Sequence, residues 1–187
     1  GEDETTGELW NVLSKVGAKL LVKTVEQIEN GTATRTPQPE EGTMAPMLSK
    51  EIAKIDWENK TAKEIKNLVR GLNPIMGAYS YINDKKIKFW KVQVLSQEQL
   101  LEEFEELKEY KGRLKQLAPG TVLFSDSKKG LFINAKEGIV QVLEIQGENA
   151  KRMPINDFLR GNSITAGNIF ENNIWQIFKK MLLYKCY

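Results

Sequence analysis

A proline-rich stretch divides this chain into two parts that cannot share one continuous helix or strand. Residues 32–47 contain Pro37, Pro39 and Pro46 together with Gly42, and they carry few apolar side chains. Proline fixes φ, lacks an amide hydrogen and pushes the residue before it into an extended conformation. We therefore predict a linker over residues 32–57, between an N-terminal segment at 1–31 and a folded domain at 58–170.

The N-terminal segment has the pattern of an amphipathic helix over residues 5–29. Thr5, followed three residues later by Glu8, forms a capping-box motif at its start. Gly31 suits its end, because glycine readily adopts the left-handed conformation that closes many helices. The apolar residues recur at helical spacing: Leu9, Val12, Leu13, Val16, Leu20, Leu21, Val25 and Ile28.

The predicted domain changes from helical spacing to strand spacing. Thr61 and Glu64 form a second capping box, which opens a short helix that ends near Gly71. Five strand candidates follow at residues 78–82, 86–94, 120–124, 131–135 and 139–145. Further helices are predicted at residues 97–114 and 154–159. We expect an α+β, mostly β fold: an OB-like five-stranded antiparallel barrel with short flanking helices.

The composition excludes several kinds of chemistry. The 187 residues contain no histidine, so Ser–His and Cys–His nucleophilic pairs and histidine metal ligands are absent. The single cysteine, Cys186, excludes an internal disulfide and a cysteine zinc site, which fits a reducing cytosol. No apolar run reaches the roughly 20 residues of a membrane span, and the acidic start at Gly1–Glu4 is unlike a signal peptide or a basic transit sequence. We expect a cytoplasmic protein without catalytic or metal-ligating residues in this chain.

Positive charge gathers in one predicted strand. Residues 85–91 hold four lysines and no acid, whereas residues 97–109 hold six glutamates and one lysine. Because strand side chains alternate, Lys86, Lys88 and Trp90 should face one way and Ile87, Phe89 and Lys91 the other. Neither face is cleanly apolar, so we expect a bulge or partial exposure near Phe89 and Trp90.

Two interpretations of this lysine-rich strand remain open. Lysines interleaved with aromatic residues suit a nucleic-acid surface that meets phosphates. A solvated lysine edge that blocks strand-to-strand aggregation, with Trp90 in the core, is the alternative. In the same way, Arg70 and Asn73 could present polar groups to a ligand, or Arg70 could brace the helix end while Asn73 and Pro74 make a turn.

Several segments resemble, in order and spacing, those of the methionyl-tRNA formyltransferases. They are DETTGEL at residues 3–9, VGAKLL at 16–21, QPEEG at 38–42, APMLSKE at 45–51, KIDW at 54–57, NLVRGLNP at 67–74, PGTVL at 119–123, KRMP at 151–154 and DFLRG at 157–161. The chain departs from the family at Ile75 and Met76, where Trp-Pro is usual. Residues 171–187 resemble nothing in the family and form an unassigned tail, in which apolar residues recur at helical spacing.

The resemblance implies a function, and it implies that catalysis and tRNA binding lie in separate domains. Family members transfer a formyl group from 10-formyltetrahydrofolate to methionyl-initiator tRNA. Their asparagine, histidine and aspartate catalytic residues lie in a Rossmann-like domain, of which residues 1–31 resemble the last helix. The resemblance therefore implies that this chain binds no folate and is inactive alone, and that its OB-like domain holds tRNA through a basic surface. The tRNA-binding candidates are Lys50, Lys85, Lys86, Lys88, Lys91, Lys128, Lys129, Lys151 and Arg152.

Two alternatives remain. The eight apolar residues of the predicted 5–29 helix would favour self-association, as a homodimer or by exchange of the helix, if they lack a sheet to pack against. A related family that formylates sugar nucleotides shares the catalytic fold, so the chain could also be the C-terminal region of such an enzyme.

Overall fold

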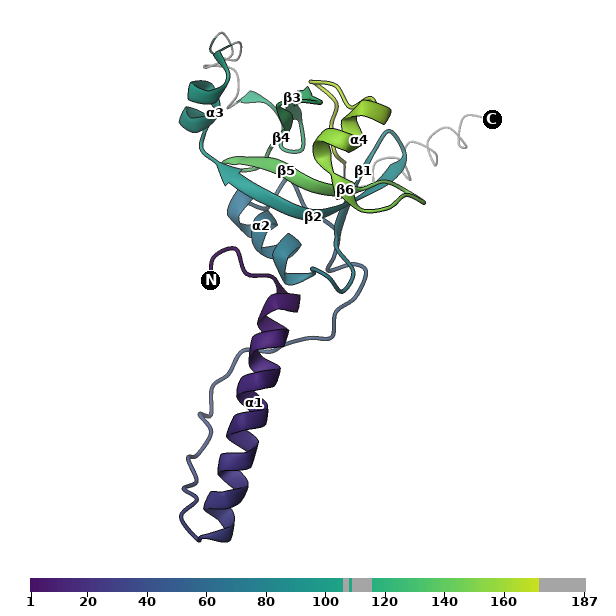
Figure 1. Cartoon of the computed structure of the whole chain (residues 1–187). Coiled ribbons are helices and arrows are strands. Elements are labelled where there is room, and N and C mark those ends of the chain that lie inside the picture. The colour runs from purple at the N-terminus through teal and green to yellow at the C-terminus, as the bar shows by residue number, and fades with distance from the viewer. Residues whose placement is uncertain (106–107, 109–115, 172–187) are drawn as a thin grey trace, which may run out of the picture.

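The computed structural model describes residues 1–105, 108 and 116–171. A long helix, α1 (Thr6–Glu29), projects away from a domain made of strands and short helices (Figure 1). The capping box at its start is present: the Thr5 side chain accepts a hydrogen bond from the Glu8 amide, and the Glu8 carboxylate accepts one from the Thr5 amide. None of the residues of α1 is buried. The predicted helix is confirmed, and residues 32–47 follow it without regular structure.

The domain contains one antiparallel sheet of six strands. They are β1 (Ala78–Ile82), β2 (Lys85–Leu95), β3 (Val122–Asp126), β4 (Gly130–Asn134), β5 (Ile139–Gln146) and the two-residue β6 (Met153–Pro154). The order is β1-β2-β5-β4-β3, and β6 pairs with β5. All five predicted strands are present. The sixth was not predicted, because two residues are too few to show an alternating pattern.

The α+β, mostly β class is confirmed, but a closed five-stranded barrel is not. The sheet is open, since β1 and β3 do not pair with each other. Residues 167–171 lie between these two strands instead: the Val122 amide donates to the Asn168 carbonyl at 2.8 Å, and the Glu171 amide donates to the Tyr81 carbonyl at 2.8 Å. This segment satisfies edge groups that would otherwise be free to pair with another chain.

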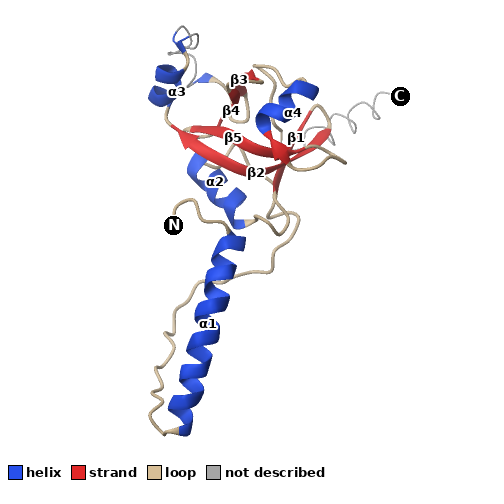
Figure 2. Cartoon of the chain, in the orientation of Figure 1, coloured by secondary structure: helices blue, strands red, loops and turns tan. Residues whose placement is uncertain are grey.

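Three short helices cover the sheet. Figure 2 shows α2 (Ala62–Gly71) on one side of the β2 and β5 ribbons and α4 (Ile155–Gly161) on the other. The third helix, α3 (Gln97–Glu103), is shorter than the predicted 97–114 helix, because Phe104 is already extended at φ −122° and ψ 95°. Residues 106–107 and 109–115 of that prediction, and residues 172–187 of the tail, lie outside the described residues.

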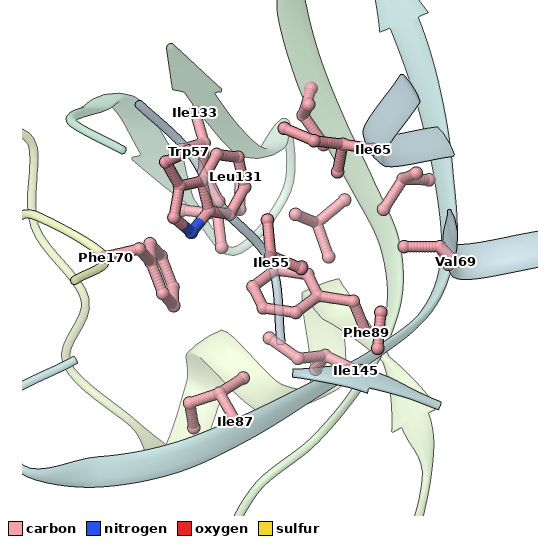
Figure 3. Close-up of a cluster of buried hydrophobic side chains, with 14 of the residues drawn as sticks. Ile55, Trp57, Ile65, Val69, Ile87, Phe89, Leu131, Ile133, Ile145 and Phe170 are labelled. Carbon is pink, nitrogen blue, oxygen red and sulfur yellow. The ribbon is translucent and has the colours of Figure 1, made fainter. Parts of the chain in front are cut away.

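Three aromatic rings join distant parts of the chain in the core. Trp57 comes from the linker end, Phe89 from β2 and Phe170 from the segment beside β1 and β3 (Figure 3). The ring centroids lie 5.4–6.0 Å apart, and each residue is at most 1% exposed. The Trp57 indole also donates to the Ser80 hydroxyl at 3.0 Å, so its polar group is satisfied inside the core.

Removing the Trp57 ring should therefore destabilise the domain strongly. We expect Trp57→Ala to lower the free energy of unfolding by about 3–5 kcal/mol, because a large cavity replaces the ring. The matched control is Trp10→Ala on α1, where the side chain is 71% exposed and the change should stay within about 0.5 kcal/mol. Urea unfolding followed by far-UV circular dichroism measures both. Equal effects of the two substitutions would contradict this description of the core.

Candidate nucleic-acid interface

The register of β1 and β2 places lysines opposite tyrosines on the outer side of the sheet. Tyr79 pairs with Lys88, and Tyr81 pairs with Lys86. The alternate residues of both strands are buried, so these four side chains share the solvent side. Trp90 and Arg152 complete what we call the basic–aromatic face: Tyr79, Tyr81, Lys86, Lys88, Trp90 and Arg152.

Cations on this face lie over aromatic rings. The Lys86 ammonium lies 3.8 Å from the centroid of the Tyr79 ring, which is itself packed edge-on against Tyr81 at 5.8 Å. The Lys88 ammonium lies 5.7 Å from the centroid of the Trp90 ring. Cation–π contacts of this kind restrict otherwise mobile lysines. The rings therefore hold the two ammonium groups in place on the surface.

Trp90 lies on the same face as Lys86 and Lys88 through ordinary strand alternation, and it is the extra residue of a bulge in β2. Phe89 pairs with Ile145 and Lys91 with Glu144, so Trp90 has no partner on β5. The predicted bulge near Phe89 and Trp90 is confirmed. Trp90 is half-buried rather than part of the core, and its indole donates to the Gln146 side chain at 3.0 Å.

Arg152 differs from the lysines because a carboxylate pairs with it. Its guanidinium donates from Nε to Glu144 at 2.6 Å and forms an ion pair with the same carboxylate through Nη2. It also lies 5.1 Å from the centroid of the Trp90 ring and donates from Nη1 to the Asn73 side chain at 3.2 Å. These four contacts make Arg152 a support for Trp90.

Lys86 lies in an unfavourable environment for a positive charge. Burial lowers the pKa of its ammonium below the ordinary value of 10.5, and the charges of Lys88 and Lys50 lower the pKa further, while Glu148 has a smaller opposite effect. Among the described residues, neither Lys86 nor Lys88 forms an ion pair with a carboxylate. An anion bound here would relieve this repulsion.

The other predicted lysines are spread over several places. Lys91 lines a cleft of about 1040 Å³ between β2 and the start of α1, next to Trp90 and Arg152. Lys85 lies at the end of the β1–β2 hairpin, and Lys151 precedes Arg152 as an exposed residue. Lys128 and Lys129 occupy the turn between β3 and β4. The structure thus gathers Lys86, Lys88 and Arg152 on one face, with Lys91 beside Trp90 and Arg152 and with Lys50 close enough for its charge to lower the pKa of Lys86.

Sequence reasoning missed the two tyrosines, although their alternation with Ala78, Ser80 and Ile82 could have revealed an aromatic outer side. For Arg70 and Asn73 the sequence favoured structural roles over contact with a ligand. Arg70 donates to the carbonyls of Gly1 and Glu4, both at 3.2 Å, so it braces the chain ahead of α1. Asn73 is 7% exposed, and its side chain is bonded to β2 and Arg152.

Other kinds of site are not visible in the described part of the chain. There, no three His, Cys, Asp or Glu side chains gather into a group that could hold a metal ion. None of the helices described is both long and apolar enough to cross a membrane.

Comparison with known proteins identifies the domain. Residues 47–163 match the family model for the formyl transferase C-terminal domain. The chain belongs to this family. It is 35% identical over 166 residues to a methionyl-tRNA formyltransferase of Ruminiclostridium cellulolyticum, covering 88% of this chain and 48% of that protein. It is 41% identical over 165 residues to a methionyl-tRNA formyltransferase of Lachnospira eligens, with coverages of 88% and 48%.

These matches confirm the resemblance inferred from the sequence motifs. The chain spans about half the length of the curated relatives it matches. A crystal structure of a HypX variant from Aquifex aeolicus is similar in fold, with a TM-score of 0.55 over 90% of this chain and 30% of that chain at 18% identity.

The lowered pKa of Lys86 allows a test of whether the Lys86 and Lys88 ammonium groups are neighbours on the basic–aromatic face. Lys88→Gln removes a neighbouring positive charge, so the pKa of Lys86 should rise toward 10.5 while the part caused by burial remains. NMR titration of ¹³C-labelled lysine side chains measures this shift. Lys63→Gln, an exposed lysine of α2, is the control and should leave Lys86 unchanged. An unchanged pKa in the Lys88→Gln protein would show that the two ammonium groups are not neighbours.

Proposed function

We propose that this chain is the tRNA-binding C-terminal region of an enzyme that formylates methionyl-initiator tRNA with 10-formyltetrahydrofolate. The observation that carries the proposal is the basic–aromatic face, where Lys86 and Lys88 are held by aromatic rings and have no carboxylate partner among the described residues. Family membership and the names of the curated relatives support the substrate. We place the protein in the cytoplasm, where translation initiates.

The chemistry of the face favours phosphates over bases. Lysine ammonium groups act as point charges on phosphate oxygens, and such contacts position a nucleic acid without reading its sequence. Side chains two residues apart on a strand are about 6.5–7 Å apart, so Lys86 and Lys88 can meet separate phosphates. Lys50 and Lys91 extend this surface, and Lys85, Lys128, Lys129 and Lys151 are more distant candidates. Arg152 contributes by holding Trp90.

The remaining assignments follow from the same proposal. Residues 1–31 form the last helix of a Rossmann-like catalytic domain, and residues 32–57 a linker whose last residues pack into the core of the following domain. Residues 58–170 form an OB-like tRNA-binding domain, and residues 171–187 a tail without an assigned role. The chain has no histidine, so we propose that the catalytic residues and the folate site belong to the other half of the enzyme. This chain alone is then inactive.

Salt-dependent tRNA binding tests the proposal. We expect Lys86→Gln and Lys88→Gln each to weaken binding of initiator tRNA and to reduce the slope of log K against log salt by about one. Filter binding between about 50 and 200 mM salt measures both quantities. Lys63→Gln on α2 is the control for loss of one surface charge.

Three results would contradict it. They are absence of tRNA binding at low salt, binding that does not depend on salt, and equal losses in the control variant. Absence of binding would favour the alternative that the chain belongs to a sugar-nucleotide formyltransferase. The curated relatives described above are named for methionyl-tRNA instead.

A second role is favoured by the exposed apolar side chains of α1. Leu9, Val12, Leu13, Val16 and Leu20 are each 43–60% exposed and lie along one side of the helix. We propose that this stripe packs against the catalytic domain in the enzyme and that, in this chain alone, it drives formation of a homodimer. An uncovered apolar patch of this length favours association.

Charged substitutions in the stripe should abolish the dimer. We expect the chain to sediment as a dimer at micromolar concentration, and the double variant Leu13→Glu, Leu20→Glu to sediment as a monomer because it would bury two carboxylates. Lys15→Glu changes the net charge by the same amount and should leave the dimer intact. Removal of residues 1–31 should also give a monomer. A wild-type chain that is monomeric throughout would exclude this role.

A further inference from the structure

The start of α1 is attached to the domain by polar contacts rather than by its apolar stripe. The Thr6 hydroxyl donates to the Gly71 carbonyl at 2.6 Å, and the Gly7 amide donates to the Asn73 carbonyl at 3.1 Å. Asp3 pairs with Lys66 at 2.6 Å. A Cβ on Gly7 would lie 2.6 Å from the Cδ atom of Pro74, so only glycine fits this contact. The direction of α1 is therefore set at the end of α2.

Asn73 also bonds to the basic–aromatic face through its side chain. Its amide nitrogen donates to the Trp90 carbonyl at 2.8 Å, and its amide oxygen accepts from Arg152 Nη1 at 3.2 Å. The Trp90 carbonyl belongs to the bulge residue, which has no strand partner. Asparagine suits this position because one side chain supplies both a donor and an acceptor.

We propose that Asn73 is a positioning residue that fixes the direction of α1 relative to the basic–aromatic face. Its backbone carbonyl holds Gly7, while its side chain holds the Trp90 bulge and Arg152. The inference rests on the proposed function, in which α1 is the last helix of the catalytic domain and the face holds tRNA. Asn73 then sets how the bound tRNA is presented to the catalytic half.

The chemistry of the contacts explains which substitutions separate these roles. Asn73→Asp keeps the acceptor for Arg152 but replaces the donor to the Trp90 carbonyl by an oxygen, so two acceptors face each other. Gly7→Ala pushes α1 away from the Pro74 ring but touches neither side-chain bond of Asn73. Arg152→Lys keeps the positive charge near Glu144 but lacks the planar guanidinium that reaches Glu144 and Asn73 together.

Two readouts on the 187-residue chain test the proposal without tRNA. The first readout is the distance between two spin labels, measured by pulsed electron paramagnetic resonance, which reports the direction of α1. The labels are attached at Lys23→Cys on α1 and Glu137→Cys on the domain. The background carries Cys186→Ser to remove the native thiol, and Leu13→Glu and Leu20→Glu to keep the chain monomeric. Lys23 lies far along α1, at about 1.5 Å per residue, so a small tilt moves it measurably. The indole N–H resonance of Trp90 reports the face by NMR.

We expect Asn73→Asp to shift both the label distance and the Trp90 resonance. Gly7→Ala should shift the distance alone. Asn162→Ala removes an asparagine bond to the Phe158 carbonyl of α4, far from the junction, and should shift neither. If Asn73→Asp does not fold, Arg152→Lys decides, because it should also shift both readouts although Arg152 does not touch α1.

The proposal is overturned if Asn73→Asp, or Arg152→Lys in its place, moves only one readout or neither. Filter binding of the same variants then separates this result from the proposed function. Gly7→Ala should bind tRNA as the wild type does, whereas Asn73→Asp should bind more weakly because the bulge moves. A wild-type chain that fails to bind tRNA would refute the proposed function while leaving the two structural readouts interpretable.

Discussion

Burial of Phe89 decides which side chains of β2 reach solvent. Its ring is fully buried between Trp57 and Phe170, and neighbouring strand residues must point to opposite sides. Lys88 and Trp90, on either side of Phe89, are therefore both directed outward, and the bulge leaves Trp90 without a partner on β5. An apolar contact in the core thus produces the charged surface.

The elements with local signals were the ones that the sequence could predict. Both capping boxes, at Thr5 and Thr61, are present as predicted, because each joins a threonine to a glutamate only three residues later in the chain. The short β6 and the segment at 167–171 gave no such signal. They form only because strands distant in sequence leave edge groups that need partners.

The candidate site also depends on contacts between residues that are distant in the sequence. The sequence shows the lysines of β2 as a run of positive charge, but it does not show that the positively charged residues near this strand have different roles. Arg152 was a phosphate candidate from its charge, yet its guanidinium is shared by Glu144, Trp90 and Asn73, which come from three separate segments. Lys86 lacks such a carboxylate partner among the described residues. Only the three-dimensional pairing distinguishes a supporting cation from one that is available to a ligand.

The first turn of α1 and the rest of the helix make contacts of different kinds. Its first turn is held by hydrogen bonds between backbone groups and short side chains, which depend on geometry and so fix a direction. The rest of the helix exposes leucines and valines, whose burial depends on area and tolerates many partners. A helix that is directed at one end and apolar along its length can join two domains, because one contact sets orientation and the other supplies most of the binding free energy.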